Sequence, residues 1–271
     1  MIANARMYSL DARVAALWRQ LFERVAGRAG VALEVIEHAA SCPLAQLWRR
    51  DDLGCVFMCG YPWSTWPRRE TRPRLLAVPL PRGERYAGRP VYCSDIVVRR
   101  DAPFTDVDAL RGTRFAFTLE SSQSGWQAPR AFFAEHALRS GGRWFGQTVG
   151  PLVTPRAVAE AVIEGRADAG PLDSYWHDLL QLHEPALAAR LRVLASTPMT
   201  PMPALVCAAS TPDHAHARLV DVLLDVANDD ALRALREGLA IHGFALPVED
   251  DYSNLARRAQ ALDARGYARL R

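Results

Sequence analysis

A cluster of small polar residues lies where an apolar run gives way to a predicted helix. Segment 113–130 reads TRFAFTLESSQSGWQAPR, and its polar cluster is Ser121, Ser122, Gln123, Ser124 and Gly125. A helix N-terminus offers unpaired N–H groups and about half a positive charge, to which hydroxyl and amide side chains add further donors. Glycine lets the backbone come close to a ligand. One hydroxyl is enough to cap a helix and this segment has three, so the cluster predicts a site for phosphate, phosphonate or carboxylate.

The rest of the chain alternates short apolar strands with amphipathic helices. Residues 12–28 carry apolar side chains at three- and four-residue steps, which predicts a helix. A second helix is predicted over 154–165, with Thr154 as its N-cap and Pro155 at its first position. Such alternation predicts an α/β fold built on parallel sheets, in which ligands bind at the carboxyl ends of the strands.

Two segments are predicted to cross between two lobes. One is the long strand near 92–96, and the other is the proline-rich stretch 195–203, in which proline favours an extended backbone. Lobe I would then consist of residues 1–93 plus 200–271, and lobe II would be the inserted segment 96–194. Each lobe is expected to be a central β-sheet flanked by helices.

Composition excludes several classes of function. The chain has 271 residues with 49% hydrophobic and 23% charged residues, and a net charge of +3 does not indicate a nucleic-acid-binding protein. All 33 basic residues are arginine, which removes Schiff-base and P-loop chemistry. The five cysteines fit no common zinc spacing and are expected to be small buried hydrophobes. We therefore expect neither a metal site nor a cofactor.

The N-terminal segment MIANARMYSLDARVAALWRQ lacks the pattern of a signal peptide. As written, the sequence predicts a cytoplasmic protein. A periplasmic location is expected if a leader has been removed or its start codon missed.

Several segments together resemble a known family. They are VYCSDIVVRRDAPFTDVDALRGTRFAFTLESSQSGWQAPRAFF, then TPRAVAEAVIEGRADAGPLDSYW, with CGYP at 59–62 and GYARL at 266–270. They are similar to the phosphate/phosphonate substrate-binding proteins of ABC transporters, in the PhnD/SsuA/transferrin-like group with the type 2 periplasmic binding protein fold. The resemblance is strong for 91–175 and weak for 1–55. It implies two lobes that close on a small anion in the manner of a Venus flytrap, and an ABC permease as partner. We expect the protein to be a monomer.

The resemblance also implies a set of ligand-binding residues. Tyr92 would line the cleft at the hinge, Tyr61 would face the anion from the other lobe, and Asp173 would pair with an amine or hydroxyl of the ligand, unless it is simply a helix cap. The full candidate set is Tyr8, Ser9, Tyr61, Tyr92, Ser121, Ser122, Gln123, Ser124, Gly125, Thr154 and Asp173.

One departure from the family pattern leaves the ligand open. The family commonly has a Ser-His pair where this chain has Thr154-Pro155, and proline supplies neither ring nitrogens nor an N–H. Arg156 is the neighbouring group that could take over the missing donor, unless it faces solvent.

Two other classes of function remain as alternatives to a binding protein. A cytoplasmic enzyme similar to chorismate dehydratase would use Glu120, Asp173 or His177 as its acid or base. A ligand-sensing module is the other alternative. The residues favour a binding protein over an enzyme, because no catalytic constellation accompanies the polar cluster.

Two tryptophans stand in a proline-broken loop directly after Tyr61. Trp63 and Trp66 would either pack on their own lobe, form the rim of the ligand site, or dock a partner. The sequence leaves these three possibilities open.

Overall fold

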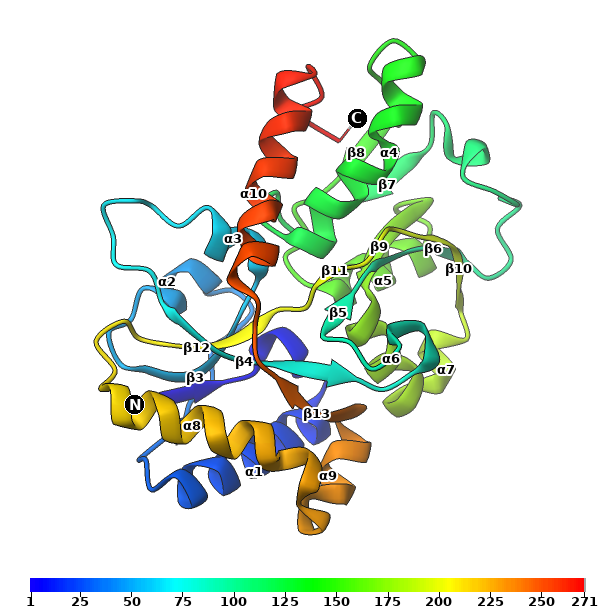
Figure 1. The fold of residues 1–271 in the computed structure, drawn as a ribbon. Coiled ribbons are helices and arrows are strands. Elements are labelled where there is room, and N and C mark those ends of the chain that lie inside the picture. The colour runs from blue at the N-terminus through cyan, green and yellow to red at the C-terminus, as the bar shows by residue number, and fades with distance from the viewer. Residues whose placement is uncertain (271) are drawn as a thin grey trace. The chain divides into compact units, whose positions relative to one another are not determined.

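The chain forms two compact units, each with its own sheet, in the computed structural model, which describes residues 1–270 (Figure 1). Unit 1 comprises Met1–Val91 and Pro201–Glu249, and unit 2 comprises Tyr92–Thr200 and Asp250–Arg271. This is the mixed α/β architecture that the sequence predicts.

Unit 1 is built on a six-stranded sheet in the order β13-β4-β12-β3-β1-β2. Its strands are β1 (Ile2–Asn4), β2 (Glu34–Val35), β3 (Leu53–Met58), β4 (Arg74–Pro81), β12 (Ala204–Cys207) and β13 (Ile241–Ala245). Its helices are α1 (Ala12–Ala29), α2 (Leu44–Trp48), α3 (Gly60–Ser64), α8 (Asp213–Asp225) and α9 (Arg233–Gly238). The predicted helix 12–28 is α1, which Asp11 caps by accepting from the Val14 N–H at 2.7 Å.

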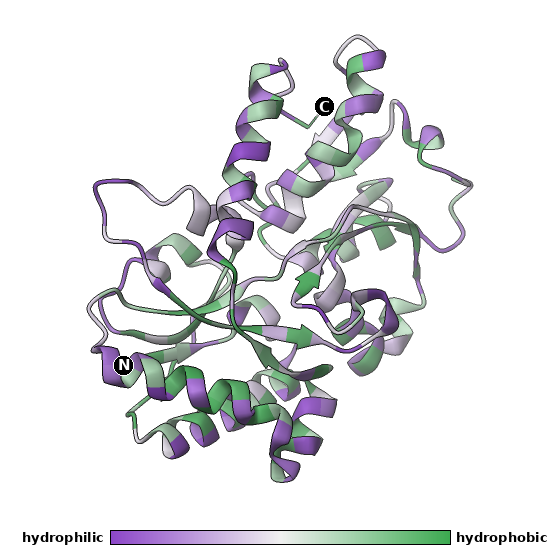
Figure 2. Cartoon of the chain, viewed as in Figure 1, coloured by the Kyte–Doolittle hydropathy of each residue, from purple (hydrophilic) through white to green (hydrophobic). Residues whose placement is uncertain are grey.

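Unit 2 is built on a five-stranded sheet in the order β10-β6-β9-β7-β8. Its strands are β6 (Ser94–Arg99), β7 (Arg114–Ala116), β8 (Gln147–Val149), β9 (Ala169–Asp173) and β10 (Leu191–Ser196). Its helices are α4 (Ala128–Arg139), α5 (Pro155–Ile163), α6 (Ser174–His183), α7 (Pro185–Ala188) and α10 (Glu249–Ala264). In Figure 2 the strands are largely hydrophobic, whereas the helices alternate hydrophobic and hydrophilic residues, as expected for helices that cover a sheet.

The sheets are mixed rather than parallel. β1 runs parallel to β2 and β3, but β12 runs antiparallel to β3 and β4. β7 runs parallel to β8 and β9, but β6 runs antiparallel to β9 and β10. The sequence predicted parallel sheets because it shows only the alternation of elements. The direction of each strand depends on where the chain enters the sheet.

The two crossing segments form a small sheet of their own. β5 (Val91–Tyr92) pairs with β11 (Thr200–Pro201), and the Met202 N–H donates to the Pro90 carbonyl at 3.0 Å. These positions lie within or next to the predicted hinge segments 92–96 and 195–203.

The C-terminal segment belongs to unit 2, which differs from the sequence-based division that placed 200–271 entirely in lobe I. Leu262, Tyr267 and Leu270 are part of the same hydrophobic core as Phe115, Phe133 and other residues of unit 2. Arg130 of α4, only 3% exposed, donates to the carbonyls of Ala268 at 2.8 Å and Ala259 at 3.1 Å, and to Asp263 Oδ1 at 2.5 Å. The unit that α10 packs against depends on these contacts between residues far apart in the sequence.

Candidate functional site

Three helical segments begin at one edge of the unit 2 sheet. Strands β7, β8 and β9 are parallel, so their carboxyl ends lie at the same edge. The chain leaves β7 into a π-helical turn, Gln123–Gln127, that opens α4, leaves β8 into α5, and leaves β9 into α6. Three helical N-termini, whose first N–H groups have no acceptor within their own helix, therefore gather at this edge.

Ser122 caps the first of these segments. Its Oγ accepts from the Gly125 N–H at 2.9 Å, and its carbonyl accepts from the Gln127 N–H at 3.0 Å, which closes the π-helical turn. A hydroxyl that accepts in a cap keeps its own hydrogen for a further acceptor. Ser121 is exposed, whereas Gln123 is only 5% exposed, so its amide lies inside the loop rather than at its surface.

Gly125 is required by close packing within the loop. A Cβ at this position would lie 1.8 Å from Thr118 Oγ1 and 2.9 Å from Thr118 Cβ. Thr118 is 5% exposed, and its Oγ1 is buried with no hydrogen-bond partner among the described residues. The sequence predicted glycine here so that a ligand could approach. The structure gives it a second reason, which is the Thr118 side chain packed against it.

Thr154 and Asp173 cap the other two helices. Thr154 Oγ1 accepts from the Ala157 N–H at 3.2 Å at the start of α5. Asp173 Oδ1 accepts from the N–H groups of Tyr175 and Trp176, both at 3.0 Å, at the start of α6. The Asp173 carboxylate thus compensates the dipole of α6, while the neutral hydroxyl caps Ser122 and Thr154 leave the positive ends of the other two segments uncompensated.

Arg156 does not supply the donor that Pro155 lacks. Its Nη1 donates to Glu184 Oε2 at 3.2 Å, its Nη2 also pairs with Glu184, and Glu160 lies at 4.0 Å. Two carboxylates already hold this guanidinium. The hydrogen-bond donors that this edge offers are therefore backbone N–H groups and hydroxyls rather than this guanidinium.

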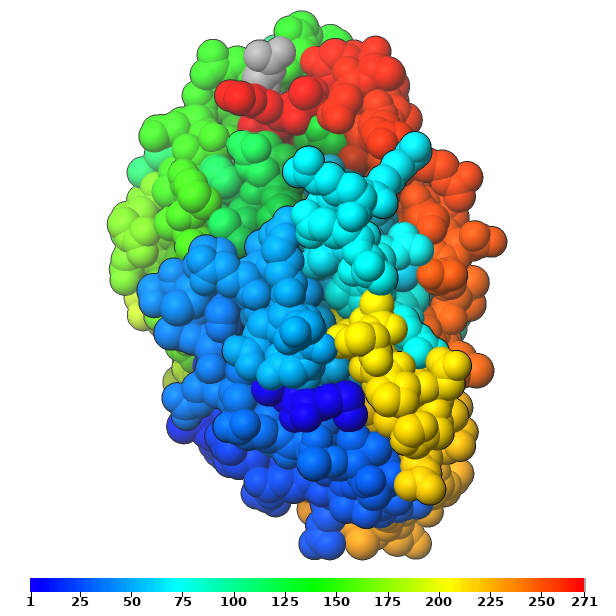
Figure 3. All heavy atoms as spheres, turned by 90° about the vertical axis from the view of Figure 1, so that its left-hand side faces the viewer, coloured from blue at the N-terminus to red at the C-terminus, as the bar shows by residue number. Residues whose placement is uncertain are grey.

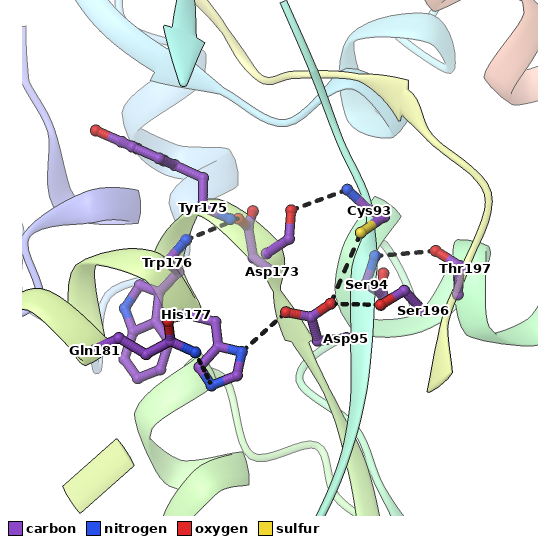
Figure 4. A network of polar contacts seen from close by, with 11 residues as sticks. Cys93, Ser94, Asp95, Asp173, Tyr175, Trp176, His177, Gln181, Ser196 and Thr197 are labelled. Atoms are coloured by element: carbon purple, nitrogen blue, oxygen red, sulfur yellow. Dashed lines mark hydrogen bonds and ion pairs between the residues drawn. The ribbon is translucent and has the colours of Figure 1, made fainter. Parts of the chain in front are cut away.

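A buried polar network underlies this edge and was largely missed from the sequence (Figure 4). Its centre is Asp95 on β6, 0% exposed, whose Oδ2 lies 2.9 Å from His177 Nδ1. Ser196 Oγ donates to Asp95 Oδ1 at 2.7 Å, and Gln181 Nε2 lies 3.4 Å from His177 Nε2. His177 lies four residues after Asp173 in the sequence, and both were candidate acid–base groups. The structure pairs it with Asp95 instead, because α6 turns that face toward β6.

Cys93, which precedes β6, and Ser94, its first residue, hold the starts of α6 and of the serine loop. Cys93 exchanges two hydrogen bonds with Ser174, the first residue of α6, at 2.9 and 3.0 Å. The Ser94 hydroxyl donates to the Ser124 carbonyl at 2.8 Å. The Ser94 N–H donates to Thr197 Oγ1 at 2.9 Å (Figure 4). Burial, together with the carboxylates of Asp173 and Asp178, raises the pKa of Tyr175 well above its ordinary value. The signal available in the sequence was the polar pair Ser94-Asp95 inside an otherwise apolar strand.

The remaining candidates lie near one edge of the unit 1 sheet, except Tyr92. Tyr8 and Ser9 follow β1, and Tyr61 follows β3, and these strands are parallel. Tyr8 is 1% exposed and packs edge-to-face on Phe57 with ring centroids 5.0 Å apart. The Ser9 hydroxyl donates to the Ala5 carbonyl at 2.9 Å, and Tyr61 is half-buried. Tyr92, on β5, is 1% exposed, so its ring is packed inside the protein.

Trp63 and Trp66 pack on unit 1. Trp63 Nε1 donates to the Pro73 carbonyl at 2.9 Å, and the Arg72 guanidinium lies 3.7 Å from the centre of its ring. The Arg49 guanidinium lies 5.5 Å from the ring centre of Trp66, which borders a surface cavity of about 560 Å³. The cavity is lined by residues 48–51, by Trp66, residues 70–71 and Pro73, and by residues 208–210, on the face shown in Figure 3.

A protein-family model matches residues 8–252 of the chain, and its description is ABC transporter, phosphonate, periplasmic substrate-binding protein. This chain belongs to that family. The match covers most of both units and confirms the resemblance seen in the sequence. No curated protein sequence matches the chain.

Solved structures of this kind share the fold of this phosphonate-family protein. A binding protein component of an ABC phosphonate transporter from Pseudomonas aeruginosa superposes with a TM-score of 0.79 at 16% identity, covering 97% of this chain and 86% of that one. PhnD1 from Prochlorococcus marinus in complex with methylphosphonate gives 0.76 at 17% identity, covering 97% of each chain. A protein from Xanthomonas citri bound to chloride gives 0.67 at 20% identity, with 97% and 98% covered. The two-lobed type 2 periplasmic binding protein fold predicted from the sequence is confirmed.

Residues 1–270 contain neither a candidate membrane-spanning helix nor a candidate metal cluster. None of the helices there combines the length and the apolar character needed to cross a bilayer. Within the same residues, no group of three or more His, Cys, Asp and Glu side chains is placed to hold a metal ion.

Proposed function

We propose that this chain is the substrate-binding component of an ABC importer and binds a small phospho-oxyanion at the carboxyl edge of the unit 2 sheet. The anion would lie against the Gln123–Gln127 turn and the start of α5, where Ser122, Ser124 and Thr154 supply hydroxyls. The observation that carries the proposal is that these two helical starts have neutral hydroxyl caps, whereas Asp173 already compensates α6.

The energetics of such a site are sufficient for capture. A hydrogen bond to a charged group contributes about 1.5–3 kcal/mol, and micromolar binding requires about 8 kcal/mol. Three or four donors from the backbone and the two caps therefore reach that range without any basic side chain. Since Arg156 is held by Glu184 and Glu160, the proposal does not depend on it.

Family membership supports a permease as partner and the periplasm as the place of action. A binding protein of this kind would act as a monomer that delivers its ligand to the permease. Stimulation of the ATPase activity of a reconstituted family transporter, in the presence of ligand and this chain, would test that role.

The direct test is isothermal titration of the full chain with methylphosphonate, 2-aminoethylphosphonate, inorganic phosphate and sulfate. The double variant Ser122→Ala/Ser124→Ala is expected to lose at least tenfold in affinity, while Ser140→Ala, at the opposite end of α4, leaves affinity unchanged. Thermal unfolding of each variant separates loss of binding from loss of folding. The proposal fails if the folded wild type binds none of these anions, or if the double variant binds as well as the wild type.

The contributions of Tyr8, Ser9, Tyr61, Tyr92, Gln123 and Asp173 stay predictions. Tyr61→Phe removes one hydroxyl from a half-buried ring and is the mildest test of the unit 1 candidates. If the Tyr61 hydroxyl contacts the ligand, Tyr61→Phe should bind the ligand more weakly than wild type with unchanged thermal stability.

A further inference from the structure

Val153 has an unusual backbone conformation directly before the α5 cap. Its φ is +68°, in the left-handed region that glycine adopts readily and that β-branched residues rarely occupy. Such a conformation is strained for a β-branched residue, and it persists only when the surrounding structure imposes it. Glycine or asparagine would occupy this position at lower cost.

The surroundings of Val153 account for the conformation. The Val153 N–H donates to the Thr118 carbonyl at 3.0 Å, and the Leu152 N–H donates to the Phe117 carbonyl at 3.0 Å. The loop before α5 is thereby fixed alongside the chain that leaves β7. The backbone requires the left-handed conformation, but nothing in these hydrogen bonds requires a valine side chain.

Thr118 connects Val153 to the serine loop. Its carbonyl holds the Val153 N–H, and its side chain packs against Gly125, where a Cβ would lie 1.8 Å from Oγ1. Thr118 is also 5% exposed, with a hydroxyl oxygen that has no hydrogen-bond partner among residues 1–270. A buried hydroxyl without a partner calls for an explanation, and a ligand bound at the serine loop would supply one.

The Val153 side chain is nevertheless exposed. It is 40% exposed and belongs to a short set of exposed large hydrophobic side chains among the described residues. Few hydrogen-bond donors follow Val153 in the chain, because Pro155 has no N–H and the Arg156 guanidinium is held by Glu184. Val153 therefore presents an exposed isopropyl group one residue before the Thr154 cap, on the loop whose backbone is bonded to Thr118.

We propose that Val153 is a specificity-determining residue that contacts the carbon substituent of a phosphonate and disfavours inorganic phosphate. This inference rests on the proposed function. Methylphosphonate and phosphate share the oxyanion and differ by a methyl group in place of a hydroxyl. A methyl group against Val153 buries apolar surface, whereas a hydroxyl placed there loses its hydrogen bonds to water without gaining a partner.

The test compares affinities of the full chain for methylphosphonate and inorganic phosphate in wild type, Val153→Gly and Val153→Asn. Both variants tolerate the left-handed conformation, so they are expected to fold with equal or higher thermal stability. The ratio of methylphosphonate to phosphate affinity is expected to fall about tenfold in Val153→Asn, and by less in Val153→Gly. Val193→Asn, which changes a valine of 41% exposure on the edge strand β10, is the matched control and is expected to keep the wild-type ratio.

The outcomes separate this inference from the proposed function. If the wild type binds methylphosphonate and both Val153 variants keep its preference, Val153 does not contact the substituent and the inference is wrong. A wild type that prefers phosphate would also overturn it. If no oxyanion binds at all, the proposed function itself fails.

Discussion

The hydroxyl of Ser94 donates to the carbonyl of Ser124 across 2.8 Å, and this bond ties a β-strand to the serine loop. Ser94 is 0% exposed, so it holds the loop without being accessible itself. Its neighbours Cys93 and Asp95 hold the first turns of α6 through Ser174 and His177. One short segment of chain thus fixes the starts of two helices relative to each other.

Replacement of Ser94 by alanine is expected to weaken oxyanion binding about threefold to tenfold. The variant leaves the Ser124 carbonyl without its donor, so the N–H groups of the loop lose their fixed direction. Titration with methylphosphonate measures the effect. Ser196→Ala, which removes a hydroxyl that donates to Asp95 but does not touch the loop, is the control and should keep its affinity. Equal loss in both variants would show that the loop has no special dependence on Ser94.

A Gly125→Ala variant is expected to displace the serine loop and to lose binding by at least tenfold. The new Cβ would lie 1.8 Å from the buried Thr118 Oγ1 and 2.9 Å from Thr118 Cβ, so the loop or Thr118 must shift to admit it. Thr118→Ala removes that oxygen, which has no hydrogen-bond partner among the described residues. The free energy of unfolding of this single variant should therefore lie within about 1 kcal/mol of the wild-type value.

The double variant Gly125→Ala/Thr118→Ala completes this cycle. Removal of Oγ1 leaves Thr118 Cβ at 2.9 Å from the added methyl, so we expect partial recovery of affinity. If the changes in binding free energy of the two single variants simply add in the double variant, with no recovery of affinity, the two side chains do not clash.

Substitution of Arg130 by leucine should destabilise unit 2 by about 2–4 kcal/mol. Loss of the guanidinium leaves the carbonyls of Ala259 and Ala268 without their donor inside the protein. Equilibrium urea unfolding measures the change. Arg139→Leu, an exposed position on the same helix, is the matched control and should lie within about 0.5 kcal/mol of wild type. Comparable losses in both variants would mean that the buried contacts of Arg130 contribute little.

The ion pair between Asp168 and Arg114 predicts a pH dependence of stability. The Arg114 guanidinium donates to both carboxylate oxygens, at 2.8 and 3.1 Å, and chiefly this hydrogen bonding holds the pKa of Asp168 below its ordinary value of 3.8. A carboxylate with a lowered pKa in the folded state stabilises the protein above its unfolded pKa, and this contribution is lost as pH falls through the folded pKa.

Asp168→Asn is therefore expected to lower the free energy of unfolding at pH 7 and to flatten its decline below about pH 4. Urea unfolding at several pH values between 7 and 3 measures both effects. Asp101→Asn is a suitable comparison, since Asp101 pairs with Arg99 at the surface and is 73% exposed. A variant curve parallel to that of wild type would show that Asp168 does not contribute to the acid dependence.

The helix boundaries and the location of the serine loop could be predicted from the sequence. The apolar period of α1 and the Thr154-Pro155 start of α5 are local features, and local hydrogen bonds decide them. Placing Ser122 at the start of a helix after a strand also needed only neighbouring residues. The family match, over residues 8–252, spans these same segments.

Partners far apart in the chain could not be predicted in this way. Asp95 and His177 are 82 residues apart, and Arg130 and Ala268 are 138 residues apart. Each of these polar side chains is buried, so its partner depends on which elements pack together. The same reason explains why the sequence-based division placed the α10 segment in lobe I, whereas it packs in unit 2.

The sequence by itself determined the α/β class, the position of the serine loop at a helix start and the family, since these depend on residue types at short spacing. Only the tertiary structure decided that Asp173 compensates α6, that Arg156 is held by Glu184, and that an exposed valine stands before the α5 cap. Whether a polar group is available to a ligand depends on whether another part of the protein already satisfies it, and that is a property of the folded chain.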